Sequence, residues 1–125
     1  MNYLITAAGR GSRFLEKGLK PPKPLIKTLG NELLIWSMNS FEFTSEDSVY
    51  LVTYKEHKVK NRLENKIKNL YPHVKIFWLE LENILRGQLL TTIEAIKYFN
   101  IKGPLLIHNC DTSHKFDLET VYSCL

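Results

Sequence analysis

The chain has 125 residues, of which 44% are apolar and 24% are charged, and its formal net charge is +4. This length suits one domain, or a piece of one, and this composition excludes a disordered or collagen-like chain. The sequence has no apolar run of the roughly 20 residues that cross a bilayer and no signal-peptide pattern at its start. Its two cysteines do not make a disulfide scaffold, so we expect a cytoplasmic protein that does not bind membranes.

The first predicted element is a buried strand over 3–7, an apolar run that stops at two closely spaced glycines. A polar loop rich in Lys and Pro continues to Lys27, and apolar residues at helical spacing then predict a helix from Asn31, its expected N-cap, to Phe41. A strand over 48–53 and an amphipathic helix over 57–70 come next. The apolar face of that helix consists of Val59, Leu63, Ile67 and Leu70. A strand over 74–79, a helix over 89–99 and a strand over 104–108 complete the series.

This alternation of strands and helices predicts an α/β fold with a parallel sheet that is covered on both faces. We expect a Rossmann-like three-layer sandwich with the strand order 3-2-1-4. In that order strands 1 and 4 are neighbours at the switch point, where ligands bind beyond the carboxyl ends of the strands. The loops over 8–13 and 109–113 should therefore face each other.

The positive charge is concentrated near the start of the chain. Residues 1–30 carry a net charge of +5, residues 31–70 are balanced, and residues 71–125 carry −1. A basic protein raises nucleic acid as a partner, and the helix over 57–70 is rich in Lys. Glu56 and Glu64 stand four residues from several of these bases and no aromatic residue interleaves them, so a solvated helix face with i, i+4 pairs explains them better, and we expect no nucleic-acid partner.

The loop after the first strand has the composition of an anion-binding loop. Gly9 and Gly11 let backbone N–H groups approach a phosphate, while Arg13 and Lys23 supply positive charge. The pattern is neither the dinucleotide fingerprint, because Phe14 replaces its third glycine, nor a Walker A loop. On its own the short Gly-x-Gly pattern also fits an ordinary glycine turn.

The longer pattern is more specific. Gly9-x-Gly11-Ser12-Arg13 is followed, after a variable loop, by Pro22-Lys23-Pro24-Leu25. Over residues 4–26 this closely resembles the signature of the sugar-phosphate nucleotidylyltransferases, and the order of elements agrees to about residue 112. Members of that family are usually about twice this length. The resemblance therefore implies that residues 1–125 form the nucleotide-binding, N-terminal half of an apparently truncated domain.

The resemblance also implies roles for individual residues. Arg13 would neutralise the β- and γ-phosphates, and Lys23 would contact the α-phosphate and the phosphate of the acceptor. Asp111, after the fourth strand, would hold Mg²⁺, although an Asp-Thr-Ser sequence is also a common turn. The other residues expected at the nucleotide are Ala7, Ala8, Gly9, Gly11, Ser12, Gly87 and Gln88.

Some of these assignments have structural alternatives. Gln88 offers a donor and an acceptor to a base edge, but it could equally decorate the start of a helix. The cluster of His108, Cys110 and His114 around Asp111 suggests a zinc site, yet its spacing matches no common zinc pattern.

The predicted function is transfer of a nucleoside monophosphate from an NTP to a phosphorylated small-molecule acceptor, such as a sugar 1-phosphate, with Mg²⁺ as cofactor. A binding module that holds a nucleotide without turning it over is the alternative. A guanylyl- or cytidylyltransferase of cofactor synthesis and a basic nucleic-acid binder rank lower. An open sheet edge would also allow association into a homo-oligomer.

Overall fold

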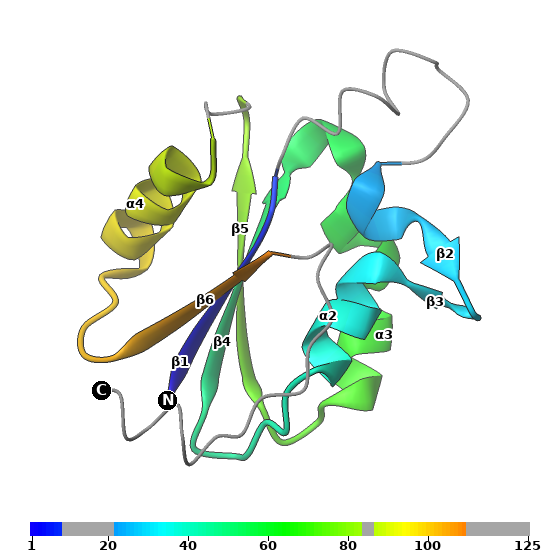
Figure 1. Cartoon of the computed structure of the whole chain (residues 1–125), viewed down its shortest axis with the longest axis horizontal. Helices are drawn as coiled ribbons and strands as arrows, with labels where there is room; N and C mark the ends of the chain where they lie inside the picture. The colour runs from blue at the N-terminus through cyan, green and yellow to red at the C-terminus, as the bar shows by residue number, and fades with distance from the viewer. Residues whose placement is uncertain (9–21, 84–86, 110–125) are drawn as a thin grey trace.

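The computed structural model describes residues 1–8, 22–83 and 87–109, and its centre is a four-stranded sheet (Figure 1). The strands are β1 (Asn2–Ala7), β4 (Ser48–Tyr54), β5 (Lys75–Leu81) and β6 (Leu105–Asn109). Their order is β5-β4-β1-β6, and every neighbouring pair is parallel. The predicted order 3-2-1-4 is confirmed, with β1 and β6 side by side at the switch point.

Helices cover both faces of this sheet, which confirms the three-layer architecture (Figure 1). Helices α2 (Leu33–Asn39) and α3 (Val59–Leu70) lie on one face, and α4 (Gly87–Phe99) lies on the other. Successive side chains of a strand point to opposite faces. In β1, Tyr3 and Ile5 accordingly enter the cluster under α2 and α3, while Leu4 enters the cluster under α4. The continuous apolar run in β1 is thus explained by burial on both faces.

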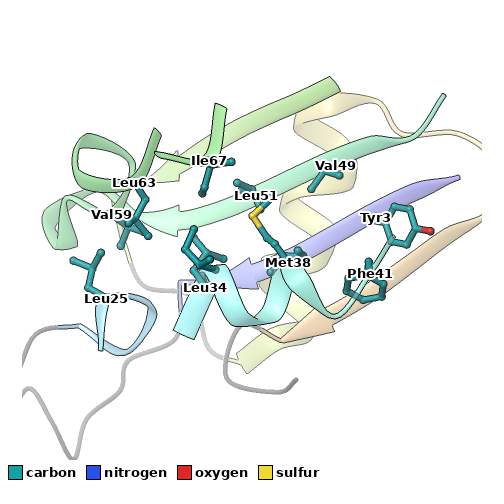
Figure 2. Packing of buried hydrophobic residues seen from close by; sticks show 13 residues of the cluster. Tyr3, Leu25, Leu34, Met38, Phe41, Val49, Leu51, Val59, Leu63 and Ile67 are labelled. Atoms are coloured by element: carbon teal, nitrogen blue, oxygen red, sulfur yellow. The ribbon is translucent and has the colours of Figure 1, made fainter. Parts of the chain in front are cut away.

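The larger core lies between the sheet and α2 and α3 (Figure 2). Leu34 and Met38 of α2 are completely buried there, as is Leu51 of β4. At the other end of the core, the Tyr3 ring lies 5.1 Å from the ring of Phe41 and 4.9 Å from that of Phe43. Phe41 is buried but follows α2 instead of belonging to it, so the observed helix is shorter than the predicted one.

The segment before α2 is more regular than the polar loop predicted for it. A 3-10 helix, η1 (Lys23–Leu25), leads into a small antiparallel hairpin of β2 (Lys27–Thr28) and β3 (Asn31–Glu32). The expectation that Asn31 caps α2 is wrong, because Asn31 pairs with Thr28 in the hairpin. Glu32 occupies the cap position and makes no side-chain capping bond there.

Smaller differences concern element ends. Helix α4 begins at Gly87, two residues before its predicted start, and α3 begins at Val59 after a short 3-10 helix, η2 (Lys55–His57). Leu70, predicted on the apolar face of α3, is 48% exposed at the end of that helix. Among the described residues, no helix is both long and apolar enough to cross a membrane.

The turn of the hairpin is strained. Leu29 and Gly30 connect β2 to β3 with φ values of 49° and 89°, and Leu29 is 89% exposed. A two-residue turn with both φ values positive favours Asn-Gly, because Asn tolerates the left-handed conformation better than Leu. We expect Leu29→Asn to raise the free energy of unfolding by about 1 kcal/mol, measured by urea denaturation. An unchanged or lower stability would contradict this account of the turn.

Candidate functional site

The carboxyl ends of β1 and β6 are joined by side-chain hydrogen bonds. Thr6 Oγ1 donates to Asn109 Oδ1 at 3.0 Å, and these two residues are direct partners in the strand register. From the opposite face of the sheet, Ser37 Oγ of α2 donates to the Asn109 carbonyl oxygen at 3.2 Å. Asn109 is thereby held from both faces of the sheet at the end of β6. Asn109 was predicted to begin the loop over 109–113, but no sequence pattern predicted these hydrogen bonds.

The end of β1 is itself tightly packed. Ala7 and Ala8, both predicted to lie at the nucleotide, are 3% and 2% exposed. Ala7 pairs with Thr53 of β4, and its side chain belongs to the core under α2 and α3. The backbone that leads into the predicted phosphate loop is therefore anchored in the sheet until the loop begins.

Lys23 lies near the start of a compact segment, residues 22–32, which we call the hairpin unit. The Leu25 amide donates to the Pro22 carbonyl at 2.8 Å, and the Ile26 amide donates to the Lys23 carbonyl at 3.2 Å. Leu25 is buried in the core beside Val59 and Leu63 of α3 (Figure 2). These contacts fix the backbone of Lys23 near the start of α3.

Two further hydrogen bonds tie the hairpin unit to α2. The Leu33 amide donates to the Ile26 carbonyl at 2.9 Å, and Trp36 Nε1 donates to the Thr28 carbonyl at 2.7 Å. The indole thus satisfies a backbone acceptor of β2. The motif Pro-Lys-Pro-Leu is therefore part of a folded segment that is hydrogen-bonded to α2, whereas the sequence predicted a polar loop there.

An ion pair connects the hairpin unit to α3. Lys66 Nζ lies 2.7 Å from Glu32 Oε1, and the Glu32 side chain is only 10% exposed. Burial raises the pKa of Glu32, but the hydrogen bond from Lys66 and the positive charges of Lys66 and Lys27 outweigh it, so that the pKa is lowered overall. The carboxylate is therefore ionised near neutral pH.

The Glu32–Lys66 pair should make stability depend on pH. Because the pKa of Glu32 is lower in the folded than in the unfolded chain, the pair stabilises the fold above the ordinary value of 4.5, and this contribution is lost as the pH falls through the folded-state pKa. We expect Glu32→Gln to lower the melting temperature clearly near neutral pH and much less at about pH 3. Equal losses at both pH values would contradict the assignment.

The start of α4 lies at the carboxyl ends of the strands, on the face of the sheet opposite to α2 and α3 (Figure 1). Gly87 has a φ of +82°, a conformation that other residues adopt only with strain, and its carbonyl accepts a hydrogen bond from Thr91 Oγ1 at 3.3 Å. Gln88 follows on the exposed surface of the first turn. Figure 1 shows α4 starting on the side of the sheet where the strands end. Gln88 therefore lies at a helix start, as the structural alternative expected, and its contact with a base stays a prediction.

A histidine that sequence analysis did not single out lies just beyond the end of β4. The His57 ring packs edge-on against Tyr54, with 4.8 Å between ring centroids. Burial lowers the pKa of His57, and the nearby charge of Glu56 only partly opposes this effect. The ring is therefore neutral at pH 7, and it adds no positive charge to this edge of the sheet.

Five of the predicted site residues lie within the described ranges, on three separate elements. Ala7 ends β1 and Ala8 follows it, Lys23 begins η1 beside α2, and Gly87 and Gln88 begin α4. The predicted site residues that lie outside the described ranges are Gly9, Gly11, Ser12, Arg13 and Asp111.

The chemistry of the donors bears on the expected metal. Across residues 1–8, 22–83 and 87–109, no three His, Cys, Asp or Glu side chains cluster closely enough to bind a metal ion. Asn109 is held at the carboxyl edge two residues before Asp111, and a carboxylate at such a position suits Mg²⁺, which prefers oxygen ligands. Asp111 itself lies outside the described residues, and its role as a metal ligand stays a prediction.

The basic residues of α3 are partly neutralised by acidic neighbours. Lys60 Nζ lies 3.7 Å from Glu64 Oε2 one turn away, as expected for a solvated helix face. Lys66 is paired with Glu32. These pairs reduce the charge that α3 offers to a polyanion.

The sequence of this chain is similar to that of a bacterial protein. No protein-family model matches the chain. The bifunctional protein GlmU of Campylobacter concisus (strain 13826) is 32% identical over 110 residues. The alignment covers 87% of this chain and 22% of GlmU, so the chain spans about a fifth of that relative's length.

Similar solved structures share the fold at lower identity. The nucleoside-diphosphate-sugar pyrophosphorylase from Vibrio cholerae RC9 matches with a TM-score of 0.77 and 23% identity over 97% of this chain and 53% of its own length. The inositol-1-phosphate CTP transferase from T. maritima matches with a TM-score of 0.64 and 19% identity over 88% of this chain and 43% of its own. The chain thus spans about half the length of these structures. The resemblance to the sugar-phosphate nucleotidylyltransferases is confirmed, and the chain corresponds to part of their nucleotidyltransferase fold.

Proposed function

We propose that this chain contributes the nucleotide-binding half of a nucleotidyltransferase. In the proposed reaction, a phosphate oxygen of the acceptor attacks the α-phosphorus of an NTP. A new P–O bond forms as the bond between the α-phosphorus and the bridging oxygen breaks, and pyrophosphate leaves. The observation that carries this proposal is the pairing of Thr6 with Asn109, which sets the carboxyl ends of β1 and β6 together at the switch point.

The residues of the chain would act mainly by positioning charge. Lys23 would contact the α-phosphate and the acceptor phosphate, while Arg13 would neutralise the departing pyrophosphate. Backbone groups of the loop that begins at Ala8, including those of Gly9, Gly11 and Ser12, would hold the phosphates. Gly87 and Gln88 would lie against the base. No covalent intermediate on the protein is required.

A divalent cation is part of the proposal. Asp111 would hold Mg²⁺, which when bound would offset the negative charge of the nucleotide phosphates. The acceptor is proposed to be a phosphorylated small molecule, since the names of the similar structures refer to a nucleoside diphosphate sugar and to inositol 1-phosphate.

Release of pyrophosphate tests the proposal directly. The chain is incubated with each common NTP, Mg²⁺ and a panel of sugar and polyol phosphates, and pyrophosphate is measured by a coupled assay. Release that requires NTP, acceptor and Mg²⁺ together supports the proposal. If the NTPs neither react nor raise the melting temperature, the proposal fails.

A catalytically incomplete nucleotide-binding module is the second candidate. The chain spans 53% and 43% of the two similar structures, so nucleotide binding and transfer by residues 1–125 have to be measured separately. This candidate requires that an NTP raise the melting temperature by mass action while no acceptor yields product.

A further inference from the structure

The ion pair between Lys66 and Glu32 joins α3, which packs on the central sheet, to the hairpin unit. Helix α3 packs on the sheet through Val59, Leu63 and Ile67, all of them buried in the core. The hairpin has its own two-stranded sheet, separate from the central one. Lys66 reaches from the third turn of α3 to Glu32, the residue at which the hairpin ends and α2 begins.

The geometry of this pair is that of a structural link. Its 2.7 Å separation is a direct charge-assisted hydrogen bond, and the Glu32 side chain is nearly buried while the Lys66 side chain is 38% exposed. An exposed pair contributes little, but a largely buried carboxylate that loses its partner is left with uncompensated charge. Removing the charge of Lys66 should therefore displace Glu32, and with it the strand β3 that precedes α2.

A displacement at Glu32 would reach Lys23 through a short chain of contacts. Glu32 pairs with Lys27 in the hairpin register, and the Ile26 carbonyl accepts the amide of Leu33, next to Glu32. The Ile26 amide in turn donates to the Lys23 carbonyl. Each step is a backbone bond, so a shift of the hairpin passes to the backbone that carries the Lys23 side chain.

We propose that Lys66 is a positioning residue for Lys23, which it holds in place by anchoring Glu32, and thus the hairpin unit, to α3. The catalytic part of this proposal rests on the proposed function of Lys23. The mechanical part, that the pair orders residues 22–32, does not depend on that function.

The mechanical part is tested by hydrogen–deuterium exchange. In Lys66→Met, amides of residues 22–32 should exchange faster than in the wild-type chain, while those of β4 and β1 should not change. Lys60→Met is the matched control, because Lys60 lies on the same helix and pairs with Glu64 within that helix. Wild-type exchange over 22–32 in Lys66→Met would overturn the proposal.

The catalytic part is tested by steady-state kinetics at a temperature well below unfolding. We expect kcat to fall about tenfold in Lys66→Met with little change in KM for the NTP, since displacing a catalytic group by a fraction of an ångström weakens the reacting geometry. Lys66→Arg should restore most of the rate, and adding Glu32→Gln to Lys66→Met should cause no further loss. A lower melting temperature with unchanged kcat would overturn the positioning role.

The two kinds of failure are distinguishable. Faster exchange over 22–32 in a chain whose wild type neither binds nor turns over any NTP supports the link and contradicts the proposed function. Turnover in the wild type, with Lys66→Met identical to it in both measurements, contradicts the link and leaves the proposed function standing.

Discussion

Lys23→Ala should lower the rate of nucleotidyl transfer by at least about 100-fold, with a smaller effect on nucleotide affinity. The loss of one preorganised group that stabilises transition-state charge typically costs this much. Because backbone hydrogen bonds and the burial of Leu25 hold the segment around Lys23 without its side chain, the alanine variant should still fold. The measurements are kcat and KM for pyrophosphate release, together with the melting temperature.

Two other variants make this result specific. Lys68→Ala removes an exposed lysine of α3, so it should leave kcat at the wild-type value. Lys23→Arg retains the charge but replaces a compact ammonium with a planar guanidinium, and it should restore only part of the rate. Transfer at the wild-type rate in Lys23→Ala would remove this residue from the mechanism, even if the chain proved to be a nucleotidyltransferase.

Leu34→Ala should destabilise the fold by about 2–5 kcal/mol, because it opens a cavity in the centre of the larger core. Leu34 is completely buried on α2, where it faces the sheet and α3 (Figure 2). Urea denaturation followed by circular dichroism would measure the loss. For a domain of this size it is a large part of the total stability.

The matched control is Leu29→Ala, the same change on a side chain that is 89% exposed. It should alter the free energy of unfolding by less than about 0.5 kcal/mol. A loss for Leu34→Ala as small as this one would mean that α2 does not pack on the sheet as the structure describes.

The strand order could be predicted because it depends on signals that the sequence carries locally. The apolar runs of β1 and β4 and the amphipathic spacing of α3 indicate each element on its own. The chirality of parallel crossovers then leaves few arrangements, and the observed order is one of them. The motif around Lys23 was likewise visible as a contiguous pattern.

The remaining features depend on contacts between distant residues. Glu32 and Lys66 are separated by 34 positions and Thr6 and Asn109 by 103, so that no local pattern links either pair. The hairpin was missed for a different reason, since its turn is Leu29-Gly30 and not the Asn-Gly sequence that marks such turns. Only the glycine of that turn carried a signal, and it is shared with many loops.

The position of β1 has a consequence for the order in which the molecule assembles. Strand β1 precedes the other three strands of the sheet in the chain, yet it pairs with β4 on one side and with β6, which ends at Asn109, on the other. Its second partner is made about a hundred residues later, so a strand that is buried on both faces in the folded chain has one edge open during synthesis. Translation speed and chaperones that shield apolar segments should therefore govern the yield of folded protein more than the final stability does.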